Sequence, residues 1–313
     1  MNTLQLGHSG LQVSELCLGI LPFGTKVDSA TCFALLDAYF EAGGRFIDTA
    51  NNYSKWHAGG VGTESETTLG AWMRARNNRN ELTIATKVGF NRDDRGLSLS
   101  SNTIALEIEG SLDRLGTDHV DLYYAHGDIR KDPLEESLES FNRIVRSGKA
   151  RAIGCSNYRA WRIEQARDIS KNNAWAEYCC CQQRHSYLRP KPGAAFGLQV
   201  SSNDDLLDYA RERGDFRLLA FSPLLKGSYT RGDRPTPPEY AGPDSDARLA
   251  MLKQVSGECG ATANQVVYAW MLQGQGIIPL TAPTTLEQLR ENLGGLKVVL
   301  AKEQIDRLDK AGA

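Results

Sequence analysis

Four residues that can take part in proton chemistry stand at the ends of short apolar runs, or just after them. Asp48 closes "RFID", Tyr53 follows five residues later, Lys87 ends "IATK" and His126 ends "YYAH". An unperturbed tyrosine has a pKa of about 10, so it acts as a general acid near neutral pH only if a neighbouring cation stabilises its phenolate. We therefore expect Lys87 beside Tyr53, with Asp48 keeping the amine protonated and His126 next to the phenol.

This set of residues suits the addition or removal of a proton on an oxygen atom while another group delivers two electrons. A Schiff-base lyase with Lys87 as nucleophile is a weaker alternative, because a partner carboxylate keeps an amine protonated. Metal-dependent hydrolysis is weaker still, since only His126 and Asp48 offer ligands at these positions. We expect no metal site.

The elements that position these residues follow a repeating pattern. Short apolar runs alternate with longer stretches of helical periodicity. The runs are "LCLGI", "RFIDTA", "LTIATKV", "VDLYYAH", "ARAIGCS", "EYCCCQ", "FRLLAFS" and "GIIPLT". Such alternation requires parallel strands with right-handed crossovers, and eight repeats predict an α/β fold that closes as an eight-stranded parallel β/α (TIM) barrel. No linker divides the chain, so we expect one barrel domain over residues 1–313.

Local signals add detail to this barrel. The opening "LQLGHSGLQVS" places a turn between two alternating runs and predicts a β-hairpin. Asp28 and Ser100 are candidate helix N-caps. The stretch 222–249 is rich in Gly, Pro and Asp and predicts a long irregular loop, whereas "LAKEQIDRLDKAG" predicts a helix that packs on the barrel.

Composition narrows the class of protein. Lys plus Arg number 36 against 38 Asp plus Glu, so no basic excess points to nucleic acid or an anionic membrane. The N-terminus lacks a targeting pattern, and no apolar stretch is long enough to span a bilayer. The seven cysteines form no C-x-x-C pair, and the run Cys179 to Cys181 is typical of a buried strand. We expect a cytoplasmic protein.

The chain resembles the aldo-keto reductases from end to end. The motifs in family order are "FIDTANNY", "GTESETTLGAWM", "IATKVG", "SLDRLGTDHVDLYYAH", "GKARAIGCSNY", "LLAFSPLLKG" and "EQLRENL". The resemblance implies a hairpin that caps the bottom of the barrel, a nicotinamide dinucleotide bound without a Rossmann domain, and interconversion of a carbonyl and an alcohol. It also implies a catalytic tetrad of Asp48, Tyr53, Lys87 and His126, with Tyr53 as general acid or base.

The same resemblance implies contacts to the cofactor, among them one from Asp48. Ser156, Asn157 and Gln182 match the positions that hold the nicotinamide carboxamide, and Phe221 matches an aromatic residue that stacks on the nicotinamide ring. The pyrophosphate-covering segment is matched by Ser222, Pro223, Leu224 and Gly227, and the adenosine end by Gln288, Glu291 and Asn292. Backbone amides of a loop that enters a helix suit a phosphate.

The choice between NADP(H) and NAD(H) depends on a cation for the 2′-phosphate. Leu280 stands where the best-known family branch carries a basic residue, and Gln288 replaces an Arg. Another cation must then serve, and the candidates are Lys226, Arg231 and Arg290. We expect NADP(H) to be preferred over NAD(H), by a narrow margin.

The substrate is expected to be a small carbonyl compound or alcohol that contacts Phe23, Tyr53, Trp56 and His126. The loops "SKWHAGG" and "NRDDRG" and the Pro-rich stretch would set its identity. An aromatic wall beside polar loops suits a ring or the face of a sugar, so a ring or polyhydroxylated ketone is favoured over a small aliphatic aldehyde.

Two other interpretations of the sequence have less support. "GVGTES" is close to a dinucleotide-binding glycine motif, but it ends in Ser65 and does not follow a strand, so a Rossmann domain is not indicated. A redox-sensing protein that binds the cofactor without turnover remains an alternative, because potassium-channel β subunits resemble the same family. The intact tetrad favours an enzyme.

Overall fold

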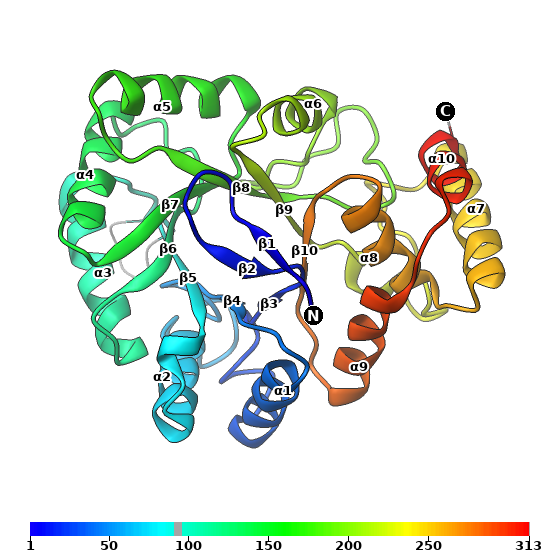
Figure 1. Cartoon of the computed structure of the whole chain (residues 1–313), viewed down its shortest axis with the longest axis horizontal. Coiled ribbons are helices and arrows are strands. Elements are labelled where there is room, and N and C mark those ends of the chain that lie inside the picture. The colour runs from blue at the N-terminus through cyan, green and yellow to red at the C-terminus, as the bar shows by residue number, and fades with distance from the viewer. Residues whose placement is uncertain (91–95, 313) are drawn as a thin grey trace.

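The computed structural model describes residues 1–90 and 96–312. Eight parallel strands from these residues close into a barrel, and helices surround it (Figure 1). The strands are β3 (Cys17–Gly19), β4 (Phe46–Asp48), β5 (Thr83–Val88), β6 (Val120–Ala125), β7 (Ala150–Ser156), β8 (Tyr178–Arg184), β9 (Arg217–Phe221) and β10 (Ile278–Thr281). Consecutive strands are neighbours, and β10 pairs with β3 to close the ring. The predicted TIM barrel is confirmed.

A hairpin covers the end of the barrel where the strands begin. It consists of β1 (Thr3–Gln5) and β2 (Gln12–Ser14), which pair antiparallel. Leu6 and Val13 are fully buried in one hydrophobic cluster with Phe46, the first residue of β4, and Ile278, the first residue of β10. The predicted hairpin is therefore confirmed, and the opposite end of the barrel remains available for side chains at the strand ends.

The helices form the outer layer and bury their apolar faces against the barrel. They are α1 (Ser29–Glu41), α2 (Glu64–Arg76), α3 (Ser101–Leu115), α4 (Leu134–Arg146), α5 (Ala160–Asn172), α6 (Asp204–Glu212), α7 (Pro243–Cys259), α8 (Ala263–Gln273), α9 (Leu286–Gly294) and α10 (Lys302–Lys310), with 3-10 turns η1 (Arg79–Glu81), η2 (Leu225–Gly227) and η3 (Gly295–Lys297). The predicted N-caps are confirmed: the Asp28 carboxylate accepts from the Thr31 amide at 3.0 Å, and Ser100 Oγ accepts from the Thr103 amide at 3.4 Å.

The prediction of one long loop over 222–249 is wrong at its end, because α7 begins at Pro243. Proline is well suited to the first turn of a helix, and Asp244 and Asp246 there complement the helix dipole. The residues that mark a turn in the sequence therefore also start a helix. Arg248 on α7 is buried and donates to the carbonyl oxygens of Tyr187 at 2.8 Å and Ala311 at 2.9 Å, which fixes the helix in place.

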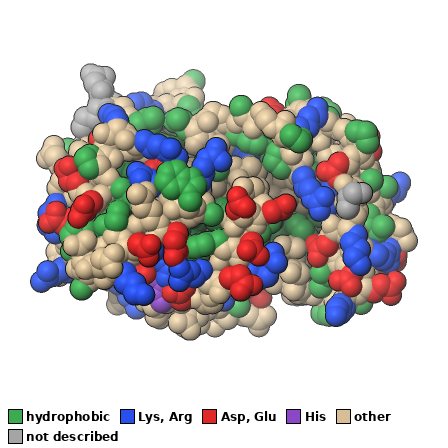
Figure 2. Space-filling model, turned by 90° about the horizontal axis from the view of Figure 1, so that it is seen from above, with side chains coloured by type: hydrophobic (Ala, Val, Ile, Leu, Met, Phe, Trp, Pro, Cys, Tyr) green, Lys and Arg blue, Asp and Glu red, His purple; other side chains and the backbone are tan. Residues whose placement is uncertain are grey.

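One side of the molecule shows acidic and basic side chains interspersed, with hydrophobic groups between them (Figure 2). This mixed distribution agrees with the nearly balanced charge of the sequence. Across residues 1–90 and 96–312, no helix combines the length and the apolar character that crossing a membrane requires.

Candidate active site

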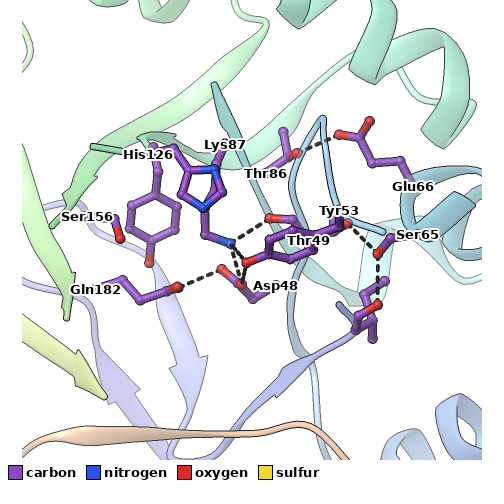
Figure 3. A network of polar contacts seen from close by, with 12 residues as sticks. Asp48, Thr49, Tyr53, Ser65, Glu66, Thr86, Lys87, His126, Ser156 and Gln182 are labelled. Carbon is purple, nitrogen blue, oxygen red and sulfur yellow. Dashed lines mark hydrogen bonds and ion pairs between the residues drawn. The ribbon is translucent and has the colours of Figure 1, made fainter. Parts of the chain in front are cut away.

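Five side chains and one backbone oxygen meet where the strands end. Lys87 Nζ donates to Tyr53 Oη at 2.8 Å and to the Thr49 carbonyl at 2.6 Å, and it forms an ion pair with Asp48 (Figure 3). Gln182 Nε2 donates to the other Asp48 oxygen at 2.8 Å. Lys87 is fully buried, and Tyr53 is 8% exposed. His126 lies beside the phenol and is 9% exposed, so Tyr53 and His126 are the least buried residues of the group.

Burial controls the protonation of this network. It raises the pKa of the Tyr53 phenol well above its ordinary value, and the negative charge of Asp48 acts in the same direction. Burial also raises the pKa of the Asp48 carboxyl and lowers that of the Lys87 amine, while the attraction between the two opposite charges opposes both shifts. The sequence led us to expect that Lys87 would make the phenol a stronger acid. In the structure burial raises the pKa, so the phenol holds its proton before any reaction, and the Lys87 amine at 2.8 Å is the group available to stabilise the phenolate once that proton leaves.

His126 follows β6 and faces the phenol edge-on, with ring centroids 5.8 Å apart. On its other side it stacks on Phe90 at 4.4 Å with an interplanar angle of 20°. Gly127 makes room for the Phe90 ring, because a Cβ at position 127 would lie 2.9 Å from that ring. Burial lowers the pKa of His126 well below its ordinary value, and its Nδ1 is buried without a hydrogen-bond partner in the described part of the chain. His126 is therefore a neutral imidazole with an unused hydrogen-bonding atom.

Phe90 is a residue that the sequence analysis missed. It stands three positions after Lys87, and an aromatic residue so close to the end of a strand rich in polar groups was the available signal. Its stacking fixes the orientation of the imidazole and removes it from water.

The positions matched to the nicotinamide carboxamide lie next to this network. Ser156 is the last residue of β7 and is buried. Asn157 follows with a left-handed φ of 60°, and its Nδ2 donates to the His126 carbonyl at 3.0 Å and to Ser156 Oγ at 3.1 Å. Its Oδ1 accepts from the Val200 amide at 3.1 Å. Asn157 is thus already engaged by the protein, whereas Ser156 Oγ only accepts a hydrogen bond among the residues that the structure describes.

Phe221 ends β9 and is half-buried, with the Arg184 guanidinium 5.6 Å from its ring centroid. The turn after it contains three left-handed residues, Ser222, Leu225 and Lys226. Left-handed residues in a turn can direct amides toward an anion. In this turn the amides of Leu225 and Gly227 bond to the carbonyls of Ser222 and Leu224, at 3.2 Å and 2.8 Å. The matched residues Ser222, Pro223, Leu224 and Gly227 all belong to this turn.

The three positions matched to the adenosine end lie on α9, just after β10. Gln288 Oε1 accepts from the Thr284 amide at 2.8 Å, Glu291 Oε1 accepts from Thr262 Oγ1 at 2.8 Å, and Asn292 Nδ2 donates to Thr281 Oγ1 at 2.8 Å. These bonds fix the start of α9 and tie the helix to β10 and to the start of α8. Because β9 and β10 are neighbours, α9 and the turn after Phe221 follow adjacent strands of the barrel.

Two positions that the sequence singled out lie in the interior of the protein, and for Phe23 the expected substrate contact requires correction. Leu280 lies within β10, pairs with Cys17, and packs in the interior cluster of the barrel with 7% exposure. Phe23 is completely buried in the main hydrophobic core beside Val27, so it has no surface with which to contact a substrate.

Trp56 stays a candidate substrate contact. It is 57% exposed, and its ring meets the Tyr53 ring edge-on at 6.3 Å. The charged segment "NRDDRG", which was expected to influence substrate choice, falls on residues 91–95 and the following glycine, and 91–95 lie outside the described residues.

The cysteine run lies in β8, where all three thiols are buried, as predicted from the sequence. Throughout residues 1–90 and 96–312, no three His, Cys, Asp or Glu side chains lie close enough together to hold a metal ion.

The structure is an eight-stranded β/α barrel with Tyr53, Lys87, Asp48 and His126 gathered at the C-terminal end of its strands, which is where enzymes of this fold carry their active sites. The family model of the Aldo/keto reductase family matches residues 15–313. The chain therefore belongs to the aldo/keto reductase family, whose members are NAD(P)H-dependent oxidoreductases.

Known relatives cover nearly the whole chain. The "Uncharacterized oxidoreductase YrpG" of Bacillus subtilis is 32% identical over 99% of this chain and 95% of its own length. The "Norsolorinic acid reductase stcV" of Emericella nidulans is 30% identical over 96% of this chain and 79% of its own length. The "Aryl-alcohol dehydrogenase GME11368" of Pestalotiopsis microspora is 26% identical over 96% of this chain and 79% of its own length.

Proposed function

We propose that the protein interconverts a ring-bearing carbonyl compound and its alcohol with NADP(H), and that Tyr53 is the general acid and base. The observation that carries this proposal is the hydrogen bond of 2.8 Å from Lys87 Nζ to Tyr53 Oη, within an ion pair with Asp48. A bound nicotinamide supplies or accepts the hydride.

In the reducing direction, the substrate oxygen lies against the Tyr53 hydroxyl and the His126 ring. The neutral imidazole donates a hydrogen bond that orients the oxygen, and the phenol gives up its proton to it. The Lys87 ammonium then stabilises the phenolate, because it already contacts the phenol oxygen. Asp48 holds the ammonium in place, and Gln182 in turn holds Asp48. In the oxidising direction the phenolate accepts the proton.

The residues present fit a dinucleotide. Ser156 and Gln182, the buried residues matched to the carboxamide, are its proposed partners, and the half-buried Phe221 is the proposed aromatic face. The phosphates are proposed to meet amides of the turn 222–227 other than those of Leu225 and Gly227, which bond within the turn. Two further atoms near that turn, Ser228 Oγ and Asn264 Oδ1, are buried without hydrogen-bond partners in the described residues. Buried polar atoms normally have partners, so unsatisfied ones favour a polar ligand there.

NADP(H) is the proposed preference, with Arg290 as the cation for the 2′-phosphate. Arg231 is engaged by Asp233 at 2.9 Å, whereas Arg290 is exposed on α9 beside the matched adenosine positions. Arg290→Gln should weaken NADPH binding by about tenfold to a hundredfold and leave NADH binding unchanged.

Fluorescence quenching titrations with both cofactors check this prediction. Arg146→Gln, at an exposed position on α4, is the matched control and should bind both cofactors like the wild type. A wild type that binds NADH more tightly than NADPH would overturn the proposed preference.

A ring-bearing substrate is supported by Trp56, whose exposed ring stands edge-on to Tyr53, and by the name of the related aryl-alcohol dehydrogenase. Contacts between aromatic rings contribute about 0.5–1.5 kcal/mol. Trp56→Ala should therefore lower kcat/KM for an aryl ketone about twofold to tenfold and leave that for a small aliphatic aldehyde unchanged.

The control for this prediction is Trp161→Ala. Trp161 is 55% exposed on α5, where it packs against Arg130 and Arg162. Loss of the Trp161 ring should change kcat/KM for neither the aryl ketone nor the aliphatic aldehyde. Equal losses for both substrates in Trp56→Ala would remove Trp56 from substrate recognition.

The test of the proposed function is a screen of reduced-cofactor consumption across aryl ketones, cyclic ketones, sugars and simple aldehydes. We expect faster consumption of the reduced cofactor with the ring-bearing compounds than with simple aldehydes. A preference for simple aldehydes would overturn the proposed substrate class.

Seven unpaired thiols also support the prediction of a reducing compartment, such as the cytoplasm.

A further inference from the structure

We propose that Ser54 is a positioning residue that holds the Tyr53 phenol against Lys87; this inference rests on the proposed role of Tyr53. Ser54 directly follows the tyrosine and adopts a left-handed φ of 74°. A residue with a Cβ is strained in that region, and such strain persists only when surrounding contacts enforce it. Ser54 is completely buried, so contacts surround it on all sides.

Hydrogen bonds of the serine side chain enforce this conformation. Ser54 Oγ donates to the Leu21 carbonyl at 2.8 Å, and Thr25 Oγ1 donates to Ser54 Oγ at 2.9 Å. Both partners belong to the segment between β3 and α1, a different part of the barrel end from the loop that carries Tyr53. The hydroxyl of Ser54 therefore ties the tyrosine loop to its neighbour.

The backbone around Ser54 is fixed as well. Its carbonyl oxygen accepts from the His57 amide at 2.9 Å. Gly60 packs so closely on the same oxygen that a Cβ at Gly60 would overlap it. The turn that follows Tyr53 is thus closed by its own residues and anchored through one side chain.

The loop before Tyr53 is held independently. The Asn51 amide donates to the Lys87 carbonyl at 3.2 Å, and Asn51 Nδ2 donates to the buried Glu107 carboxylate at 2.7 Å. Tyr53 therefore lies between two anchors, and only the second depends on Ser54. Loss of that anchor lets the strained turn relax and moves the phenol away from Lys87, while the cofactor positions on the other strands are unaffected.

The experiment compares Ser54→Ala and Ser54→Gly with the wild type. Alanine removes the tether and keeps the strain, whereas glycine removes both. Ser54→Ala should lower kcat by about tenfold to a hundredfold, because a misplaced catalytic group is that costly. Ser54→Gly should lower kcat less, because no strain is left to drive the turn out of its conformation. In both variants substrate KM and cofactor Kd should stay within about twofold of the wild type. Ser245→Ala is the matched control: Ser245 is buried on α7 and donates to the Tyr240 carbonyl at 2.5 Å, so its loss should lower Tm without lowering kcat.

A second pair of variants tests the tether from its other side. Thr25→Val removes the hydroxyl that reaches Ser54 and should lower kcat, whereas Thr25→Ser keeps it and should restore kcat to near the wild-type value. The two Thr25 variants test the positioning role of Ser54 even if a Ser54 variant does not fold.

Wild-type kcat in the folded Ser54 variants and in Thr25→Val, together with an inactive Tyr53→Phe, would overturn the role of Ser54 and leave the proposed function intact. An active Tyr53→Phe would instead overturn the role of Tyr53 itself. A fall in kcat accompanied by an equal loss of cofactor affinity would assign Ser54 to general stability and contradict the positioning role.

Discussion

Replacing Tyr53 with phenylalanine should lower kcat by about two to four orders of magnitude and leave cofactor affinity unchanged. Tyr53 and His126 are the least buried residues of the network, and burial raises the pKa of the phenol, which keeps its proton in place. Phenylalanine removes that proton but keeps the ring that packs edge-on against His126 and Trp56. Steady-state rates and cofactor titrations on the same preparation measure the two quantities separately.

The control for this variant is Tyr209→Phe. Tyr209 on α6 also loses a hydroxyl hydrogen bond, to Glu164 at 2.8 Å, but lies outside the proposed site. It should retain wild-type turnover. A Tyr53→Phe enzyme with near wild-type kcat would show that the proton comes from another group.

Lys87→Met should abolish turnover and lower the free energy of unfolding by about 3–5 kcal/mol. Both members of the Lys87 and Asp48 pair are buried, so removal of the ammonium leaves a carboxylate without a compensating charge. The double variant Asp48→Asn, Lys87→Met removes that charge as well and should recover part of the stability without recovering turnover. Urea unfolding and steady-state kinetics on the single and double variants measure both effects.

A single variant as stable as the wild type would contradict a charged pair at this position. It would indicate that Asp48 is protonated and Lys87 neutral, which is the state that favours a nucleophilic amine.

The Schiff-base alternative has one observation in its favour, because burial lowers the pKa of the Lys87 amine. Against it, Lys87 is completely enclosed and already contacts Asp48, Tyr53 and the Thr49 carbonyl. Sodium borohydride added with substrate should therefore trap no adduct on Lys87 of the wild type, as checked by mass spectrometry. A substrate-dependent adduct on Lys87 would favour the Schiff-base lyase mechanism instead.

The barrel and its polar strand ends were predictable because both follow from regular patterns. Alternation of strand and helix permits few topologies, and the C-terminal ends of parallel strands meet at one end of a barrel. Asp48, Lys87 and Gln182 could therefore be placed together from their positions in the runs, and the structure brings them within hydrogen-bonding distance.

What the sequence did not reveal depends on loop paths and on burial. Phe23 follows the first barrel strand in a segment that turns its ring into the core, and Leu280 lies inside a strand that continues past Pro279. The pKa direction of the Tyr53 phenol required the actual extent of burial. The left-handed turn at Ser54 and the stacking of Phe90 on His126 arise from contacts between distant segments, which no local pattern encodes.

The most direct test of the account is a single-turnover measurement on the wild type. Enzyme saturated with NADPH is mixed with an aryl ketone, and the loss of cofactor absorbance is recorded together with the alcohol formed. One alcohol per NADPH oxidised, with a rate that falls by at least about a hundredfold in Tyr53→Phe, is the result the account predicts. Tightly bound cofactor that no carbonyl compound oxidises would contradict it and identify the protein as a cofactor-binding sensor.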